Sequence, residues 1–123
     1  MTPSRPLLLF AALNGAMAVA VGAFAAHGAG PGVKTLLTTG AQYQMVHAVL
    51  AIVCAIWAGH SSLVRLAGWL ACLGGMVFCL SLSLIALLSL SAMGMVAPIG
   101  GLLMIAAWLS LAVAAVRNSP ASA

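Results

Sequence analysis

Acidic side chains are absent from this chain. Its 123 residues include no Asp or Glu and only four Lys or Arg, so that 3% of the residues are charged. Soluble proteins average about 25% charged residues, because a soluble fold needs a polar surface. Apolar residues make up 65% of the chain, and its mean hydropathy is +1.26. We therefore expect an integral membrane protein, and not a soluble enzyme, a nucleic-acid-binding module or a disordered chain.

The missing carboxylates also limit the chemistry open to the chain. General bases, hard-metal sites and proton relays in membranes commonly use Asp or Glu. His, Tyr and Cys are the remaining acid–base groups, and we predict no catalytic residue and no enzyme activity. Cys54, Cys72 and Cys79 are odd in number and form no C-x-x-C motif. We interpret them as small buried residues and predict no metal site.

Four segments are apolar and long enough to cross a membrane, which takes about 20 residues of helix for a hydrocarbon core of about 30 Å. Glycine, proline and serine separate these spans, which cover about residues 7–26, 41–58, 66–90 and 98–116. Small residues at four-residue spacing inside them are typical of close helix packing in membranes. We predict an all-α fold, an integral membrane antiparallel four-helix bundle with short loops, as a single transmembrane domain over residues 1–123.

The basic residues predict an orientation. Arg5, Arg65 and Arg117 lie on one side of the four-span arrangement and Lys34 on the other. The positive-inside rule then places both termini in the cytoplasm. A competing interpretation treats the first apolar stretch, ending at Ala23-Phe24-Ala25, as a cleaved secretory signal that would leave three spans. That stretch is longer than a usual signal core, which favours four spans.

Polar side chains gather on the non-cytoplasmic side of this arrangement. They are His27 at the end of the first span, and Gln42, Tyr43, Gln44 and His47 in the first two turns of the second. Because residues three or four apart share a helix face, Gln44 and Tyr43 can each lie beside His47. These five residues are our candidate ligand-binding site. Its two imidazoles could ligate a metal ion or haem iron.

A structural role is the alternative for the same residues. Polar groups inside membrane helices commonly bond to neighbouring helices, and we expect Asn14, midway along the first span, to do so. Thr39 and Gln42 have the spacing of a capping box, which would begin the second helix. Under this interpretation the polar cluster ties the first loop and the helix ends together and binds no ligand.

Three segments resemble a known family. They are Gly22-Ala23-Phe24-Ala25-Ala26-His27-Gly28, the run from Thr39 to Ala48 (TGAQYQMVHA), and Ala97-Pro98-Ile99-Gly100-Gly101. In this order they resemble the small membrane-protein family that includes the bacterial proteins YwdK and YgdD, over about residues 8–108. Ala25 departs from the pattern, because similar proteins often have Gly there. The resemblance implies four transmembrane helices in a bacterial inner membrane and no assigned reaction. It also implies a structural motif of Gly22, Phe24, Pro98, Gly100 and Gly101 beside the five polar residues.

Two functions remain open. The first is a non-catalytic accessory or scaffold protein of a membrane complex, surrounded by lipid and in contact with a larger assembly or with further copies of itself. The alternative is a protein that binds a lipid-like or redox ligand, such as a quinone or haem, at the His/Gln/Tyr cluster. A transporter would need a polar path through the membrane, which the cytoplasmic half of the bundle lacks. We expect no nucleic-acid partner, and the sequence assigns no cofactor.

Overall fold

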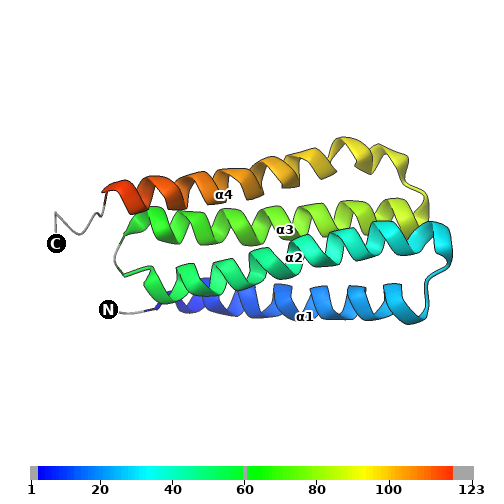
Figure 1. The fold of residues 1–123 in the computed structure, drawn as a ribbon, viewed down its shortest axis with the longest axis horizontal. Coiled ribbons are helices and arrows are strands. Elements are labelled where there is room, and N and C mark those ends of the chain that lie inside the picture. The colour runs from blue at the N-terminus through cyan, green and yellow to red at the C-terminus, as the bar shows by residue number, and fades with distance from the viewer. Residues whose placement is uncertain (1–2, 60, 118–123) are drawn as a thin grey trace.

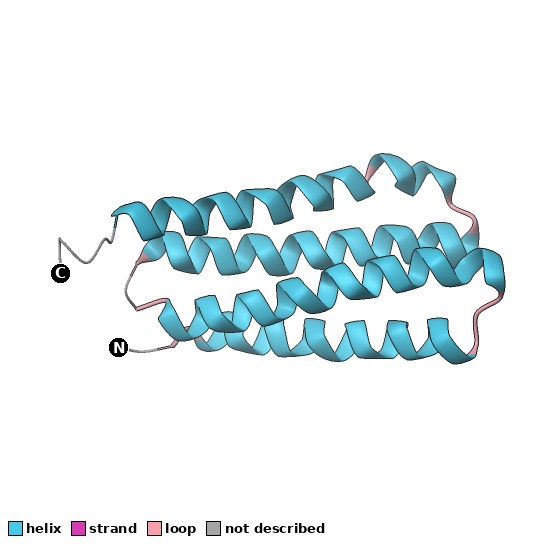
Figure 2. Ribbon diagram, in the orientation of Figure 1, coloured by secondary structure: helices cyan, strands magenta, loops and turns pink. Residues whose placement is uncertain are grey.

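The computed structural model describes residues 3–59 and 61–117 and, over these residues, consists of antiparallel helices without strands (Figures 1 and 2). The elements are α1 (Arg5–His27), α2 (Pro31–Trp57), α3 (Ser62–Leu88), the short 3-10 helix η1 (Ser91–Met95) and α4 (Ala97–Arg117). Four candidate spans, the last combining η1 with α4, are long and apolar enough to cross a membrane. The prediction of an all-α membrane fold of four packed helices is confirmed.

Most helix boundaries lie close to the predicted spans, but α2 begins ten residues before the expected start at residue 41. Gly30 is its N-cap and Pro31 its first residue. Proline suits this position because its ring presets the helical φ angle and its missing N–H would have no partner there. Thr39 and Gln42 consequently lie inside the helix, and the capping-box interpretation is wrong. Only residues 28–30 connect α1 to α2.

The helices pack in chain order. Helix α2 packs against α1 and α3, and α3 packs against α4. Helix α1 touches α3 over a smaller area, whereas α4 has no comparable contact with α1 or α2. Figure 1 accordingly shows α2 and α3 between the two outer helices. The bundle is therefore open between α1 and α4, and its core depends on the two central helices.

Small side chains make up much of the core. A cluster of buried side chains lies toward the end of the bundle that carries the chain termini, and it includes Ala11, Ala51, Ala67 and Ala107. Cys54, Cys72 and Cys79 are free and buried, as interpreted from the sequence. Small residues let helix backbones approach closely, which is how membrane helices gain packing energy without a hydrophobic driving force.

Helices α3 and α4 approach each other closely at two facing glycines, Gly74 and Gly100. A Cβ atom added to Gly100 would lie 2.7 Å from the backbone nitrogen of Phe78 and 2.8 Å from the carbonyl oxygen of Gly74. The next residue, Gly101, faces away from this contact, and an added Cβ there would have no described atom within 4 Å beyond its own turn of helix and its chain neighbours. Two adjacent glycines therefore occupy opposite environments.

This contrast predicts opposite effects of one added methyl group. Gly100→Ala should lower the free energy of unfolding by about 1–3 kcal/mol, because the new methyl must push the α3 backbone away. Gly101→Ala should be neutral or stabilising by up to about 1 kcal/mol, because alanine favours the helix. Reversible unfolding of both variants in mixed detergent micelles measures the difference. Equal stability of the two variants would contradict the close α3–α4 contact.

Candidate functional site

The five polar residues predicted as a ligand site do not share one environment. Gln44 and His47 are buried, with 1% and 5% of their surface exposed, whereas His27, Gln42 and Tyr43 are exposed. The difference follows from their positions around the helices. Gln44 and His47 lie on the inner surface of α2, and His27 is the last residue of α1.

Gln44 connects α2 to α1. Its Nε2 donates a hydrogen bond of 2.9 Å to Oδ1 of Asn14, and Asn14 Nδ2 donates to the carbonyl oxygen of Phe10 at 3.0 Å. The expectation that Asn14 bonds to a neighbouring helix is therefore confirmed. Gln44 Oε1 is buried without a hydrogen-bond partner among the residues described. An unpaired buried acceptor carries a desolvation cost, which the packing of the helices around this amide pair must offset.

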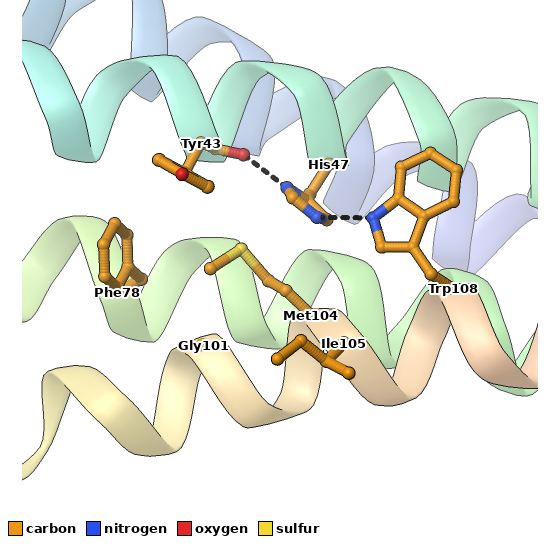
Figure 3. A pocket seen from close by; sticks show the side chains of 7 residues that line it. All are labelled: Tyr43, His47, Phe78, Gly101, Met104, Ile105 and Trp108. Atoms are coloured by element: carbon orange, nitrogen blue, oxygen red, sulfur yellow. Dashed lines mark hydrogen bonds between the residues drawn. The ribbon is translucent and has the colours of Figure 1, made fainter.

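His47 connects α2 to α4, and both of its ring nitrogens are engaged. Nδ1 lies 2.7 Å from the carbonyl oxygen of Tyr43, and the indole Nε1 of Trp108 donates to Nε2 at 3.0 Å (Figure 3). An indole N–H can only donate, so Nε2 must accept and Nδ1 must carry the proton that it donates to the carbonyl. These bonds assign His47 as a neutral imidazole in the Nδ1–H form. Its Nε2 lone pair is not free for a metal ion.

An aromatic-lined hollow lies between α2 and α4 beside this bond. Its volume is about 410 Å³, and its lining comprises Tyr43, His47, Phe78, Gly101, Met104, Ile105 and Trp108 (Figure 3). The rings of Tyr43 and Phe78 meet edge-on with centroids 5.2 Å apart. A second hollow of about 300 Å³ lies next to it and shares Tyr43 and His47 with it. We refer to the larger of the two as the α2–α4 groove.

The two histidines considered as a pair of ligands are not brought together. Gly15 of α1 faces Ala48 of α2, so His47 lies close to the level of Gly15. His27 follows Gly15 by 12 residues on the same helix. At 1.5 Å per residue, His27 is about 18 Å from that level, toward the loop. The geometry offers no site in which both imidazoles could hold one metal ion.

The residues of the resemblance motif lie mainly at helix contacts and helix ends. Gly22 faces Ala41 of α2, the Phe24 ring covers Gly28 at the end of α1, and Gly100 contacts α3. The remaining two motif residues are Pro98, in the first turn of α4, and Gly101, in the α2–α4 groove. Four of the five motif residues thus have a packing or helix-starting position.

Trp108 is the hydrogen-bonding residue that sequence reasoning missed, and that reasoning did not predict the groove residues Phe78, Met104 and Ile105 either. The signal for Trp108 was its depth, because it lies at the middle of the span predicted at residues 98–116. Tryptophan favours the interface, where its N–H can reach water. An indole at mid-span needs a hydrogen-bond acceptor inside the protein. The sequence offered both Asn14 and His47 as polar candidates on other spans, and local spacing does not choose between them.

Comparison with known proteins identifies relatives over nearly the whole chain. The family model DUF423, described as a protein of unknown function, matches residues 21–101. A UPF0382 membrane protein of Staphylococcus epidermidis is 36% identical over 118 residues, covering 92% of this chain and 97% of the relative. The UPF0382 membrane protein YwdK of Bacillus subtilis is 35% identical over 120 residues, covering 92% and 98%. No solved structure matches the chain. The resemblance stated from the sequence motifs is confirmed.

The His47–Trp108 bond predicts a specific loss of stability. Trp108→Phe removes the donor and leaves a buried imidazole nitrogen unpaired, so the free energy of unfolding should fall by about 1 kcal/mol. The matched control is Trp57→Phe. Trp57 and Trp108 are similarly exposed, at 55% and 47%, but the Trp57 indole makes no hydrogen bond to another side chain among the described residues, so its change should stay within about 0.5 kcal/mol. Unfolding in mixed micelles gives both values. Nitrogen-15 NMR of the imidazole should show the Nδ1–H form in the wild type, and the opposite tautomer there would overturn the assignment.

Proposed function

Taking as premise that this chain belongs to the DUF423 family of membrane proteins, we propose that it is a non-catalytic accessory or scaffold protein of a membrane complex. The observation that supports this is the use of the polar side chains within the spans. Asn14, Gln44, His47 and Trp108 form hydrogen bonds with other parts of the same chain. Side chains engaged in this way hold helices in position, which is their ordinary role in membrane proteins.

The outer helices supply the surface for such a role. Large apolar side chains on α1 and α4 are exposed, among them Leu9, Leu13, Leu102 and Leu109. In a bilayer this surface contacts lipid or the helices of another protein, and both outer helices are only lightly covered by the rest of the chain. A partner could therefore pack against α1 or α4 without disturbing the core.

The ends of the bundle differ in charge, which supports an orientation. Arg5, Arg65 and Arg117 lie in the first turn of α1, the first turn of α3 and the last turn of α4, all at one end. Lys34 lies in the first turn of α2 at the opposite end. Under the positive-inside rule the arginine-rich end faces the cytoplasm. Together with the bacterial relatives, this supports a multi-pass protein of the bacterial inner membrane with both termini in the cytoplasm.

The alternative function, quinone or haem binding at the His/Gln/Tyr cluster, has weaker support. Haem iron needs a nitrogen lone pair, and Nε2 of His47 accepts a hydrogen bond from Trp108 instead. Ligation would require the α2–α4 bridge to open. His27 is exposed but stands alone at the end of α1.

Site-specific photo-crosslinking in intact membranes tests the scaffold role. A photoreactive residue is placed at Leu13 on α1, at Leu109 on α4 and at Val49 on α2, all of which are exposed. We expect one protein adduct of constant size from a single outer face. Val49 serves as the control for unspecific capture. Adducts to lipid alone at every position, or the same protein adduct at all three positions, would argue against an accessory role.

Reporter fusions test the orientation. Green fluorescent protein joined to the C-terminus should fluoresce, because it folds in the cytoplasm and fails to fold when exported in unfolded form. Alkaline phosphatase inserted at Gly30, between α1 and α2, should be active, because it needs an exported environment. The inverse pattern would place the arginine-rich end outside and refute the proposed orientation.

A further inference from the structure

We propose that Arg65 and Trp69 on α3 bind the headgroup region of one anionic phospholipid, from the leaflet at the arginine-rich end of the bundle. The Arg65 guanidinium pairs with the phosphate, and the Trp69 indole N–H donates a hydrogen bond to an ester carbonyl of the same lipid. This proposal goes beyond the scaffold function and does not depend on it, because it concerns the lipid around the protein and not a protein partner.

The arginines at this end have no acidic side chain to pair with. Arg5, Arg65 and Arg117 are exposed there, and the chain contains no Asp or Glu. Leu7 of α1 packs against Gly68 of α3. These two residues follow Arg5 and Arg65 by two and three positions, so the two arginines lie at nearly the same level of parallel helices. Their counter-ions must come from outside the chain, and in a bilayer these are lipid phosphates. Two guanidiniums at one level repel the ammonium group of a zwitterionic headgroup, which favours a lipid of net negative charge.

Arg65 lies at the edge of the hydrocarbon core. Gly40 of α2 is level with Cys79 of α3, because a Cβ added to Gly40 would lie 3.1 Å from the Cα atom of Cys79. Lys34 precedes Gly40 by six residues on the antiparallel helix, so it is level with Ile85. Arg65 and Ile85 are 20 residues apart. This separation corresponds to about 30 Å of helix, which is the thickness of a hydrocarbon core. The cations of α2 and α3 thus lie at its two boundaries, where Arg65 can reach lipid phosphates.

Trp69 lies one turn below Arg65 on the same face of α3. Residues four apart share a helix face and are about 6 Å apart along its axis. The Cα–Cβ bonds of a helix tilt toward its N-terminus, so both side chains lean toward the membrane surface at this end. The Trp69 ring is partly buried and stacks on Phe10 of α1, with centroids 5.6 Å apart. Among the described residues its N–H has no acceptor, because the one indole hydrogen bond found there is that of Trp108. A cation with a free N–H donor below it matches a phosphate with an ester carbonyl below it.

Mass spectrometry of the intact protein, released from mild detergent micelles, tests the proposal. The protein is titrated with phosphatidylglycerol, which is anionic, or with zwitterionic phosphatidylethanolamine of the same acyl chains. The wild type should retain one phosphatidylglycerol about fivefold more strongly than phosphatidylethanolamine. Arg65→Gln should weaken the retention of phosphatidylglycerol by about fivefold. The matched control is Arg117→Gln, which removes the same charge at the same end. Val113 and not an indole lies one turn below Arg117, so this variant should retain the lipid.

Trp69→Phe separates the hydrogen bond from the charge. It keeps a ring against Phe10 and removes only the N–H, so both lipids should be retained about fivefold more weakly, while the preference for phosphatidylglycerol remains. Circular dichroism melting curves establish that each variant is folded. Arg65 is exposed, so Arg65→Gln supplies an independent result in case Trp69→Phe does not fold.

Three results would overturn the proposal. The first is equal retention of the two lipids by the wild type. The second is equal loss of phosphatidylglycerol in Arg65→Gln and Arg117→Gln, which is the result of unspecific attraction to the arginine-rich end. The third is retention by folded Trp69→Phe that equals that of the wild type. None of these results affects the photo-crosslinking test of the scaffold function.

Discussion

Hydrogen bonding inside the bilayer is the constraint on which this structure depends. Hydrocarbon offers no partner to an N–H or C=O group, so backbone polar groups must pair within helices and polar side chains must pair with each other or with backbone. The chain answers this demand with long helices and with bonds from Asn14, Gln44, His47 and Trp108 to acceptors in the protein, which leave Gln44 Oε1 as a buried acceptor without a partner among the described residues. Without carboxylates it has no buried negative charge to neutralise, and its few cations lie at the helix ends.

Among the residues described, two hydrogen bonds join side chains of different helices, and both have one partner on α2. Gln44 reaches α1 and His47 reaches α4. These outer helices lack an extensive contact with each other, so α2 relates them indirectly. Each such bond contributes on average about 0.6 kcal/mol in membrane proteins. These bonds therefore add little to the stability of the fold, and they also fix the rotation of α2 about its axis against its neighbours.

The fold was predictable because hydropathy and length alone identify membrane helices. The start of α2 was not predicted, because its first ten residues resemble a loop in composition. They are nevertheless helical, and Pro31 provides a good first residue for the helix. That Asn14 bonds to a neighbouring helix could be expected because a lone amide at mid-membrane has few alternatives, but the sequence did not say which helix. The partner of His47 could not be found from local spacing, which compares residues on one helix. Trp108 lies 61 residues away, and only the packing of α4 against α3 brings it within reach.

The adjacent residues Gly100 and Gly101 show how one dipeptide can have two roles. Gly100 lets α4 approach α3 at Gly74, which fixes the distance and direction of α4 from the centre of the bundle. A step of one residue turns the helix by about 100°. Gly101 therefore faces the space between α2 and α4, where its missing side chain widens the groove. This close contact holds α4 against α3 and leaves a gap between α4 and α2. Among the side-chain hydrogen bonds described, the bond from Trp108 to His47 is the one that crosses this gap. The same backbone approach that packs one side of α4 thus creates the hollow on the other.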